Sequence, residues 1–183
     1  LAYFWEPSLM KDAHMDSRHL QFIKESLLEM QETLAPYQLR VELLTGEVED
    51  ILTELSEQLD IRTIFSYQES GIGLTFQRDL AIKKWVKSRG VRWIEAKMDG
   101  IDRGRKNRSG WRDSMLRDLC KPIFTPDFRS IQSIILPESL HKRREIPINT
   151  QRVQGFQQGG ESTANRYLNG FLKKRFPDYL THI

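Results

Sequence analysis

Short apolar runs alternate with amphipathic segments along the first half of the chain. Four runs have the length and apolar character of strands in a parallel sheet, and they lie at residues 1–5, 39–44, 61–67 and 91–97. Between these runs, apolar residues recur at steps of three and four, which is the period of one helix face. The alternation predicts an α/β fold, in which a parallel sheet carries helices on both faces and the crossovers are right-handed.

Three amphipathic helices are expected between the strands. The first can be capped by Asp16 or Ser17 and ends before Pro36. Its apolar face carries Leu20, Ile23, Leu27, Met30 and Leu34. The second has an apolar face that consists of Val48, Ile51, Leu52, Leu55 and Leu59. The third spans residues 75–89, stops at a glycine, and is expected to bury Phe76, Leu80, Ala81 and Trp85.

The order of the strands indicates where a ligand would bind. Because the chain begins with Leu1 rather than Met, we expect residues upstream of it. One more strand there would give five strands, of which four are visible here, in a Rossmann-like, doubly wound sheet. Such sheets bind ligands at the carboxyl ends of the strands, near the switch in strand order. The residues expected at these ends are Glu6, Ser66, Tyr67, Gln68 and Glu69.

The second half of the chain is irregular, with a short helix expected at residues 111–119. So long an irregular stretch is typical of a functional arm or an interdomain linker. A new amphipathic segment then starts in "FQQGGESTANRYLNGFLKKRF" at residues 156–176, after a Gly-Gly pair. The sequence therefore predicts a fresh helix close to residue 183.

Composition narrows the class of protein. With 183 residues, of which 39% are hydrophobic, the chain can form one domain with an appendage. It has no apolar run of about 18 residues, so we expect no membrane partner. The single cysteine, Cys120, excludes an internal disulfide framework and favours a reducing, cytoplasmic location. The four histidines and one cysteine lack the spacing of metal ligands, so no metal site is expected.

Positive charge is concentrated in two places, although the net charge is only +3. The sequences "DRGRKNR" at residues 102–108 and "HKRRE" at 141–145 could attract a phosphate backbone, or could be solvated loops. Arg78 and Asp79 could form a surface pair or reach into a ligand crevice. Trp5 and Trp93 are expected in the core, whereas Trp111 is the better candidate for an exposed role.

No stretch has a catalytic spacing. The sequence "ESGIG" at residues 69–73 lacks the spacing of a dinucleotide fingerprint or a P-loop. There is no Ser/His/Asp or Cys/His arrangement, so no catalytic residue is assigned. The side chains of the cluster Asp12, His14, Asp16 and His19 are expected to cap the helix that follows or to lie at the surface.

Several stretches together resemble the photolyase/cryptochrome family. "YFWEPSLMKDAHMDSRHLQFIKESLLEM" is similar to a strand, turn and helix of the family, and "LRVELLTGE" to the next strand. "SYQESGIGLTFQRDLAIKKW" carries an Arg-Asp pair at the matching positions, Arg78 and Asp79. The most specific stretch is "GGESTANRYLNGFL", which resembles the start of the family's helical flavin-binding domain.

The resemblance implies an antenna domain of a DNA photolyase. In the full-length protein, FAD would lie in a C-terminal helical domain and drive light-dependent repair of pyrimidine dimers. A folate or flavin antenna chromophore would bind the α/β domain, and the candidate contacts are Glu6, Ser66, Glu69 and Arg78. Thr75 and Phe76 stand where folate-binding members carry an acidic residue, which counts against the usual folate pocket.

The resemblance also implies a division of the chain and a partner. Residues 1–100 would form the antenna core, residues 101–158 the connection, and residues 159–183 the start of the helical domain. The candidate DNA contacts are Arg103, Arg105, Lys106 and Arg108. The fragment alone is not expected to be catalytic. The alternatives are a cryptochrome photoreceptor without repair activity and a free-standing α/β nucleotide-binding module.

Overall fold

The structure is a computed structural model that describes residues 1–97, 100–144 and 154–181. The chain divides into two compact units. The first unit comprises Leu1–Thr45, Asp127–Leu136 and His141–Ile183, and the second comprises Gly46–Pro126 and Pro137–Leu140. The four expected strands are all present, they pair in parallel, and helices alternate with them. The predicted α/β class is therefore confirmed.

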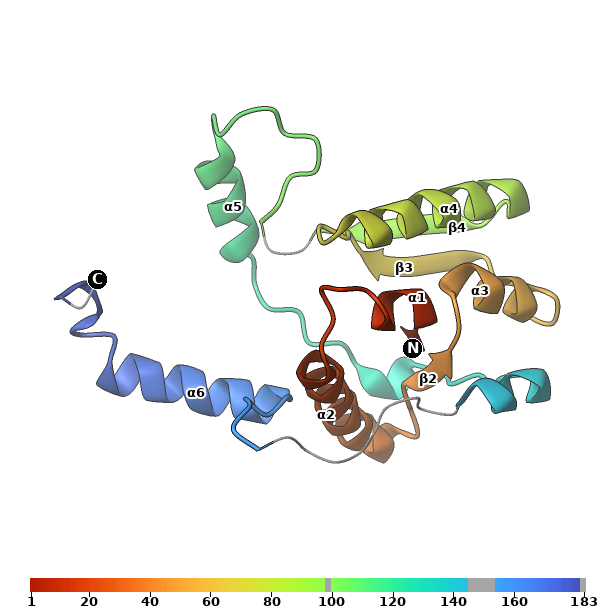
Figure 1. Cartoon of the computed structure of the whole chain (residues 1–183), viewed down its shortest axis with the longest axis horizontal. Helices are drawn as coiled ribbons and strands as arrows, with labels where there is room; N and C mark the ends of the chain where they lie inside the picture. Colours follow the sequence, from red (N-terminus) through yellow and green to blue (C-terminus); the bar gives the residue numbers. More distant parts are fainter. Residues whose placement is uncertain (98–99, 145–153, 182–183) are drawn as a thin grey trace. The chain divides into compact units, whose positions relative to one another are not determined.

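The first unit contains one pair of parallel strands. Strand β1 (Ala2–Trp5) pairs with β2 (Glu42–Thr45), and helices α1 (Pro7–Met10) and α2 (Ser17–Leu34) connect them together with the short helix η1 (Ala35–Tyr37) (Figure 1). The strand β2 starts later than residue 39. The backbone N–H of Val41 donates to the side-chain Oε1 of Gln31 at 2.7 Å, so this donor is used outside the strand ladder.

Helix α2 begins with a reciprocal cap, which decides between the two expected capping residues. The Asp16 carboxylate accepts a hydrogen bond from the backbone N of Arg18 at 3.0 Å, and the backbone N of Asp16 donates to Nδ1 of His19 at 3.1 Å. This arrangement satisfies donors that a helix start leaves unpaired. The capping interpretation of this polar cluster is confirmed for Asp16 and His19. The helix then packs its apolar face on a core that contains Trp5, Leu27, Leu34 and Val41.

The second unit contains the other pair of parallel strands. Helix α3 (Val48–Ser56) is followed by β3 (Thr63–Tyr67), α4 (Gly73–Arg89), β4 (Arg92–Ala96) and α5 (Trp111–Leu119). Strands β3 and β4 pair from Thr63↔Arg92 to Tyr67↔Ala96. Helix α4 ends at Gly90, whose φ of 68° is in the left-handed region that glycine adopts without strain.

The buried face of α4 differs in part from the predicted one, since Trp85 is buried as expected but two other predicted residues are not. Phe76 and Leu80 are 51% and 39% exposed, whereas the buried residues of the helix are Thr75, Ile82, Trp85 and Val86. The apolar residues of this helix are spread around its circumference, so their spacing does not select a face. A hydrogen bond from Nε1 of Trp85 to Oγ1 of Thr53 on α3, at 2.8 Å, fixes the face instead.

The remaining helices follow the irregular stretch. They are η2 (Phe128–Ser130), η3 (Glu138–Arg144), α6 (Glu161–Lys174) and η4 (Tyr179–Thr181). The helix expected after the Gly-Gly pair is therefore present as α6. Among the residues that the structure describes, none of the helices combines the length and the apolar character that a membrane span requires.

Two adjacent leucines of α2 provide a matched test of the core. Leu27 is 7% exposed and Leu28 is 45% exposed. We expect Leu27→Ala to lower the free energy of unfolding by about 2–5 kcal/mol, because it removes buried methyl groups and leaves a cavity. Leu28→Ala should change it by less than about 1 kcal/mol. Urea denaturation measures both, and equal losses would contradict the assignment of the helix face.

Candidate functional site

A cluster of charged side chains lies at the carboxyl ends of β3 and β4. Glu69 follows β3, and Arg78 and Asp79 lie on α4. Nη2 of Arg78 is 3.6 Å from Oε2 of Glu69 and 3.0 Å from Oδ1 of Asp79. The structure thus brings together two of the predicted ligand-binding residues, Glu69 and Arg78, at the edge of the sheet where parallel α/β folds bind ligands.

Arg103 joins this cluster to the loop after β4. Its Nη1 lies 3.0 Å from Oε1 of Glu95, its Nη2 lies 3.1 Å from Oδ2 of Asp79, and its Nε donates to the carbonyl oxygen of Glu69. The sequence analysis did not identify Glu95. A signal was available, because Glu95 is the one acidic residue within the apolar run of the fourth strand.

The other two predicted ligand-binding residues have different surroundings. The hydroxyl of Ser66 on β3 accepts a hydrogen bond from Nε1 of Trp93 on β4, at 2.9 Å. This cross-strand contact gives Ser66 a structural role beside the cluster. Glu6 lies in the first unit, where it is buried directly after β1.

Two of the four predicted DNA contacts bind the chain's own carboxylates. Arg103 pairs with Asp79 and Glu95, and Nε of Arg105 donates to Oδ2 of Asp102 at 2.9 Å. A hydrogen bond from Lys97, and then that from Arg105, hold the pKa of Asp102 below its usual range, while the pKa of Lys97 is raised by Asp102. Lys106 and Arg108 are exposed. All four residues are exposed, and Arg103 and Arg105 are in addition held by carboxylates of the chain.

Trp111 is half-buried, so the exposed role expected for it was wrong. Its Nε1 donates to the carbonyl oxygen of Gly100 at 2.9 Å. Gly100 has a φ of 65°, and a Cβ atom there would lie 2.9 Å from Cγ of Met115. Trp111 thus closes the basic loop onto α5 instead of presenting a free aromatic face.

The Gly-Gly pair before α6 makes a close contact with α2, within the first unit. The backbone N of Gly159 donates to Oε2 of Glu25 at 2.8 Å, and that of Gly160 donates to Oγ of Ser26 at 3.0 Å. A Cβ atom on Gly159 would lie 2.2 Å from the carbonyl oxygen of Phe22. The second glycine has a φ of 103°. The contact therefore requires glycine at both positions, for steric and conformational reasons respectively.

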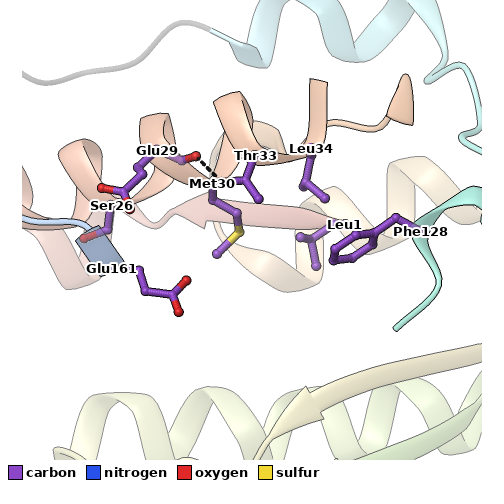
Figure 2. Close-up of a pocket in the computed structure, with 8 residues that line it drawn as sticks. All are labelled: Leu1, Ser26, Glu29, Met30, Thr33, Leu34, Phe128 and Glu161. Carbon is purple, nitrogen blue, oxygen red and sulfur yellow. Dashed lines mark hydrogen bonds between the residues drawn. The ribbon is translucent and has the colours of Figure 1, made fainter. Parts of the chain in front are cut away.

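Helix α6 receives its N-terminal cap from α2. The Glu29 carboxylate accepts hydrogen bonds from the backbone N of Ser162 at 2.7 Å and from the Ser162 hydroxyl at 2.8 Å. These two bonds lower the pKa of Glu29. Beside this contact lies a cavity of about 410 Å³, shown in Figure 2, with mostly apolar walls. Its lining consists of Leu1, Ser26, Glu29, Met30, Thr33, Leu34, Phe128 and Glu161.

The rest of α6 leaves its apolar residues in solvent. Tyr167 and Leu168 are 52% and 53% exposed, and Phe176, which follows the helix, is 58% exposed. Phe171 packs edge-to-face on Phe176 and Tyr179, with ring centroids 6.0 and 5.5 Å apart. The aromatic side chains at this end of the helix thus contact one another, and an apolar face of α6 remains uncovered.

The chain belongs to the DNA photolyase family. A family model for DNA photolyase matches residues 1–99, which include all four strands. The fold is also similar to that of an archaeal photolyase from Sulfolobus tokodaii, solved with two FAD molecules, at 17% sequence identity and a TM-score of 0.49. That match covers 63% of this chain and 28% of the archaeal chain. No curated protein matches the sequence.

Proposed function

We propose that this chain is the antenna domain of a DNA photolyase, whose full-length form repairs pyrimidine dimers in DNA with light. The observation that carries the proposal is the family match over residues 1–99. The fragment alone has no catalytic role in this proposal, because FAD and the lesion would bind a C-terminal helical domain. The single, exposed Cys120 is consistent with a cytoplasmic protein.

The proposal divides the chain after the sheet strands. Residues 1–100 form the antenna core, residues 101–158 connect the domains, and residues 159–183 begin the helical domain. The uncovered apolar face of α6 supports this division, because a helix of a self-contained domain buries such a face. The same face argues against the third candidate, a free-standing nucleotide-binding module.

The charged cluster at the ends of β3 and β4 is the proposed antenna site. The residues there fit a planar, polar chromophore of folate or flavin type, since Arg78 can pair with an anionic group and Glu69 can accept from a ring N–H. Both side chains are partly exposed, so a ligand can exchange with their mutual ion pair. Ser66 lies beside them, and Glu6 is retained as a candidate from the first unit. When bound, the chromophore would absorb light and transfer the excitation to FAD.

The basic loop after β4 is the proposed DNA contact. Lys106 and Arg108 are exposed and can meet phosphates directly. Arg103 and Arg105 are paired with carboxylates of their own chain, and they support the loop that presents the other two. All four cations therefore contribute to the site, two by contact and two by positioning.

A repair assay with the full-length protein separates the two light-driven candidates. We expect blue light to reverse pyrimidine dimers in DNA, with no reversal in the dark, because electron transfer from FAD requires excitation. The measurement is the loss of dimers after illumination. Dimers that persist in the light, although the protein carries FAD, would contradict repair and favour the cryptochrome alternative.

The salt dependence of DNA binding tests the basic loop. For the full-length protein, we expect the double variant Lys106→Gln, Arg108→Gln to reduce the slope of log K against log salt by roughly 2, because each phosphate contact contributes roughly 0.9. The matched control is Lys83→Gln, Lys87→Gln, which removes the same charge from exposed positions of α4. An unchanged slope in the loop variant would assign both cations to solvent.

A further inference from the structure

One turn of α2 provides the hydrogen-bond acceptors for the segment at the start of α6. The side chains of Glu25, Ser26 and Glu29 accept hydrogen bonds from three backbone N–H groups of that segment, those of Gly159, Gly160 and Ser162. The contact joins residues separated by more than 130 positions along the chain. The contact is therefore a specific tertiary contact between α2 and α6, both of which belong to the first unit.

The carboxylates replace a cap that α6 does not have. The first four N–H groups of a helix lack partners within the helix, and the N-cap side chain usually supplies one. The N-cap residue here is Gly160, which has no side chain to do so. Glu29 supplies the acceptor from another helix, and its negative charge lies at the positive end of the α6 dipole.

Each of the two carboxylates accepts a hydrogen bond on both of its oxygens. Glu29 uses one oxygen for the Ser162 backbone N and the other for the Ser162 hydroxyl. Glu25 accepts from Gly159 through Oε2 and from the side-chain amide of Gln21 through Oε1, at 3.0 Å. A carboxylate is a stronger acceptor than a neutral carboxyl group, and a proton on an oxygen that faces a backbone N–H would place two donors against each other, so the geometry favours the ionised form.

We propose that Glu25 and Glu29 form a charge-dependent latch, which holds α6 on α2 while both carboxylates are ionised and releases it when either is neutralised. The latch is a property of this chain and does not depend on the antenna or repair assignment. If the proposed function is right, the latch also sets the direction in which the helical domain leaves the α/β domain.

Charged groups of the described residues that lie near the latch include Glu161 and Arg18. Glu161 of α6 and Glu29 of α2 line the same cavity, as Figure 2 shows, and Glu25 lies one turn before Glu29. The guanidinium of Arg18 lies over the ring of Phe156, 5.6 Å from its centroid, at the segment that leads into the glycines. The carboxylates of the latch thus face backbone N–H groups as their partners.

The direction of the pH dependence follows from Glu29. Its pKa is lowered in the folded chain, so the contact contributes its full stability above the usual glutamate pKa. That stability is lost as the pH falls through the lowered pKa, so the release occurs below the pH at which an ordinary glutamate titrates.

Amide hydrogen exchange in the 183-residue chain tests the latch. We expect Glu29→Gln to lower the protection of the Ser162 amide about tenfold, because it replaces a charged acceptor by a neutral one. The control is Glu32→Gln, which removes the same charge from an exposed position of the same helix. That variant should leave Ser162 protection within about twofold.

A pH series of the unsubstituted chain provides the second measurement. It tests the latch even if the Glu29→Gln variant does not fold. Protection of Ser162 should fall in step with titration of the Glu29 carboxyl group, while amides in the middle of α2 stay protected. Unchanged protection in Glu29→Gln, or protection of Ser162 that persists below the titration of Glu29, would overturn the latch. Neither readout involves light or DNA, so failure here leaves the proposed function untouched.

Discussion

Gly159 approaches α2 so closely that a Cβ atom there would collide with the carbonyl oxygen of Phe22. This absence of a side chain lets the backbone reach the acceptors of α2. Once the backbone is in place, Glu25, Ser26 and Glu29 satisfy N–H groups that would otherwise lack partners at the start of α6. The two glycines of the Gly-Gly-Glu motif thus have a physical explanation, because they let the backbone approach α2. The helix that follows is then capped by Glu29 of α2.

Side-chain contacts between distant segments also organise the second unit, but there a cation binds carboxylates. The guanidinium of Arg103 reaches two carboxylates and a carbonyl oxygen around the ends of β3 and β4. Several partly buried carboxylates close together repel one another unless a cation lies between them. Arg103 supplies that cation from the loop, so the order of the loop and the charge balance of the strand ends depend on each other.

The sequence predicted the elements better than the contacts between them. Apolar runs located all four strands to within three residues, because burial of parallel strands demands such runs. The inward face of α4 could not be read, since its apolar residues do not form a stripe and the hydrogen bond from Trp85 to Thr53 joins distant positions. The role of Glu29 was equally hidden, because nothing local to an amphipathic helix marks which of its carboxylates caps another helix. Glu69, by contrast, was predicted from a strand end and Arg78 from its Arg-Asp pair, and the two do meet.

The uncovered face of α6 connects these observations to function. Helix α6 contacts α2 at its start, and Tyr167 and Leu168 farther along it are exposed, which is the apolar surface that the proposed division of the chain relies on. The family match covers the four strands and stops before the glycines, and the boundary that we propose between them remains part of the proposed function.

The close contact at the glycines can be observed directly by nuclear Overhauser spectroscopy. We predict cross-peaks between the backbone N–H of Gly160 and the side chain of Ser26, and their loss in Gly159→Ala, which cannot approach α2. Absence of these cross-peaks in the unsubstituted chain, or their persistence at full intensity in Gly159→Ala, would contradict the account.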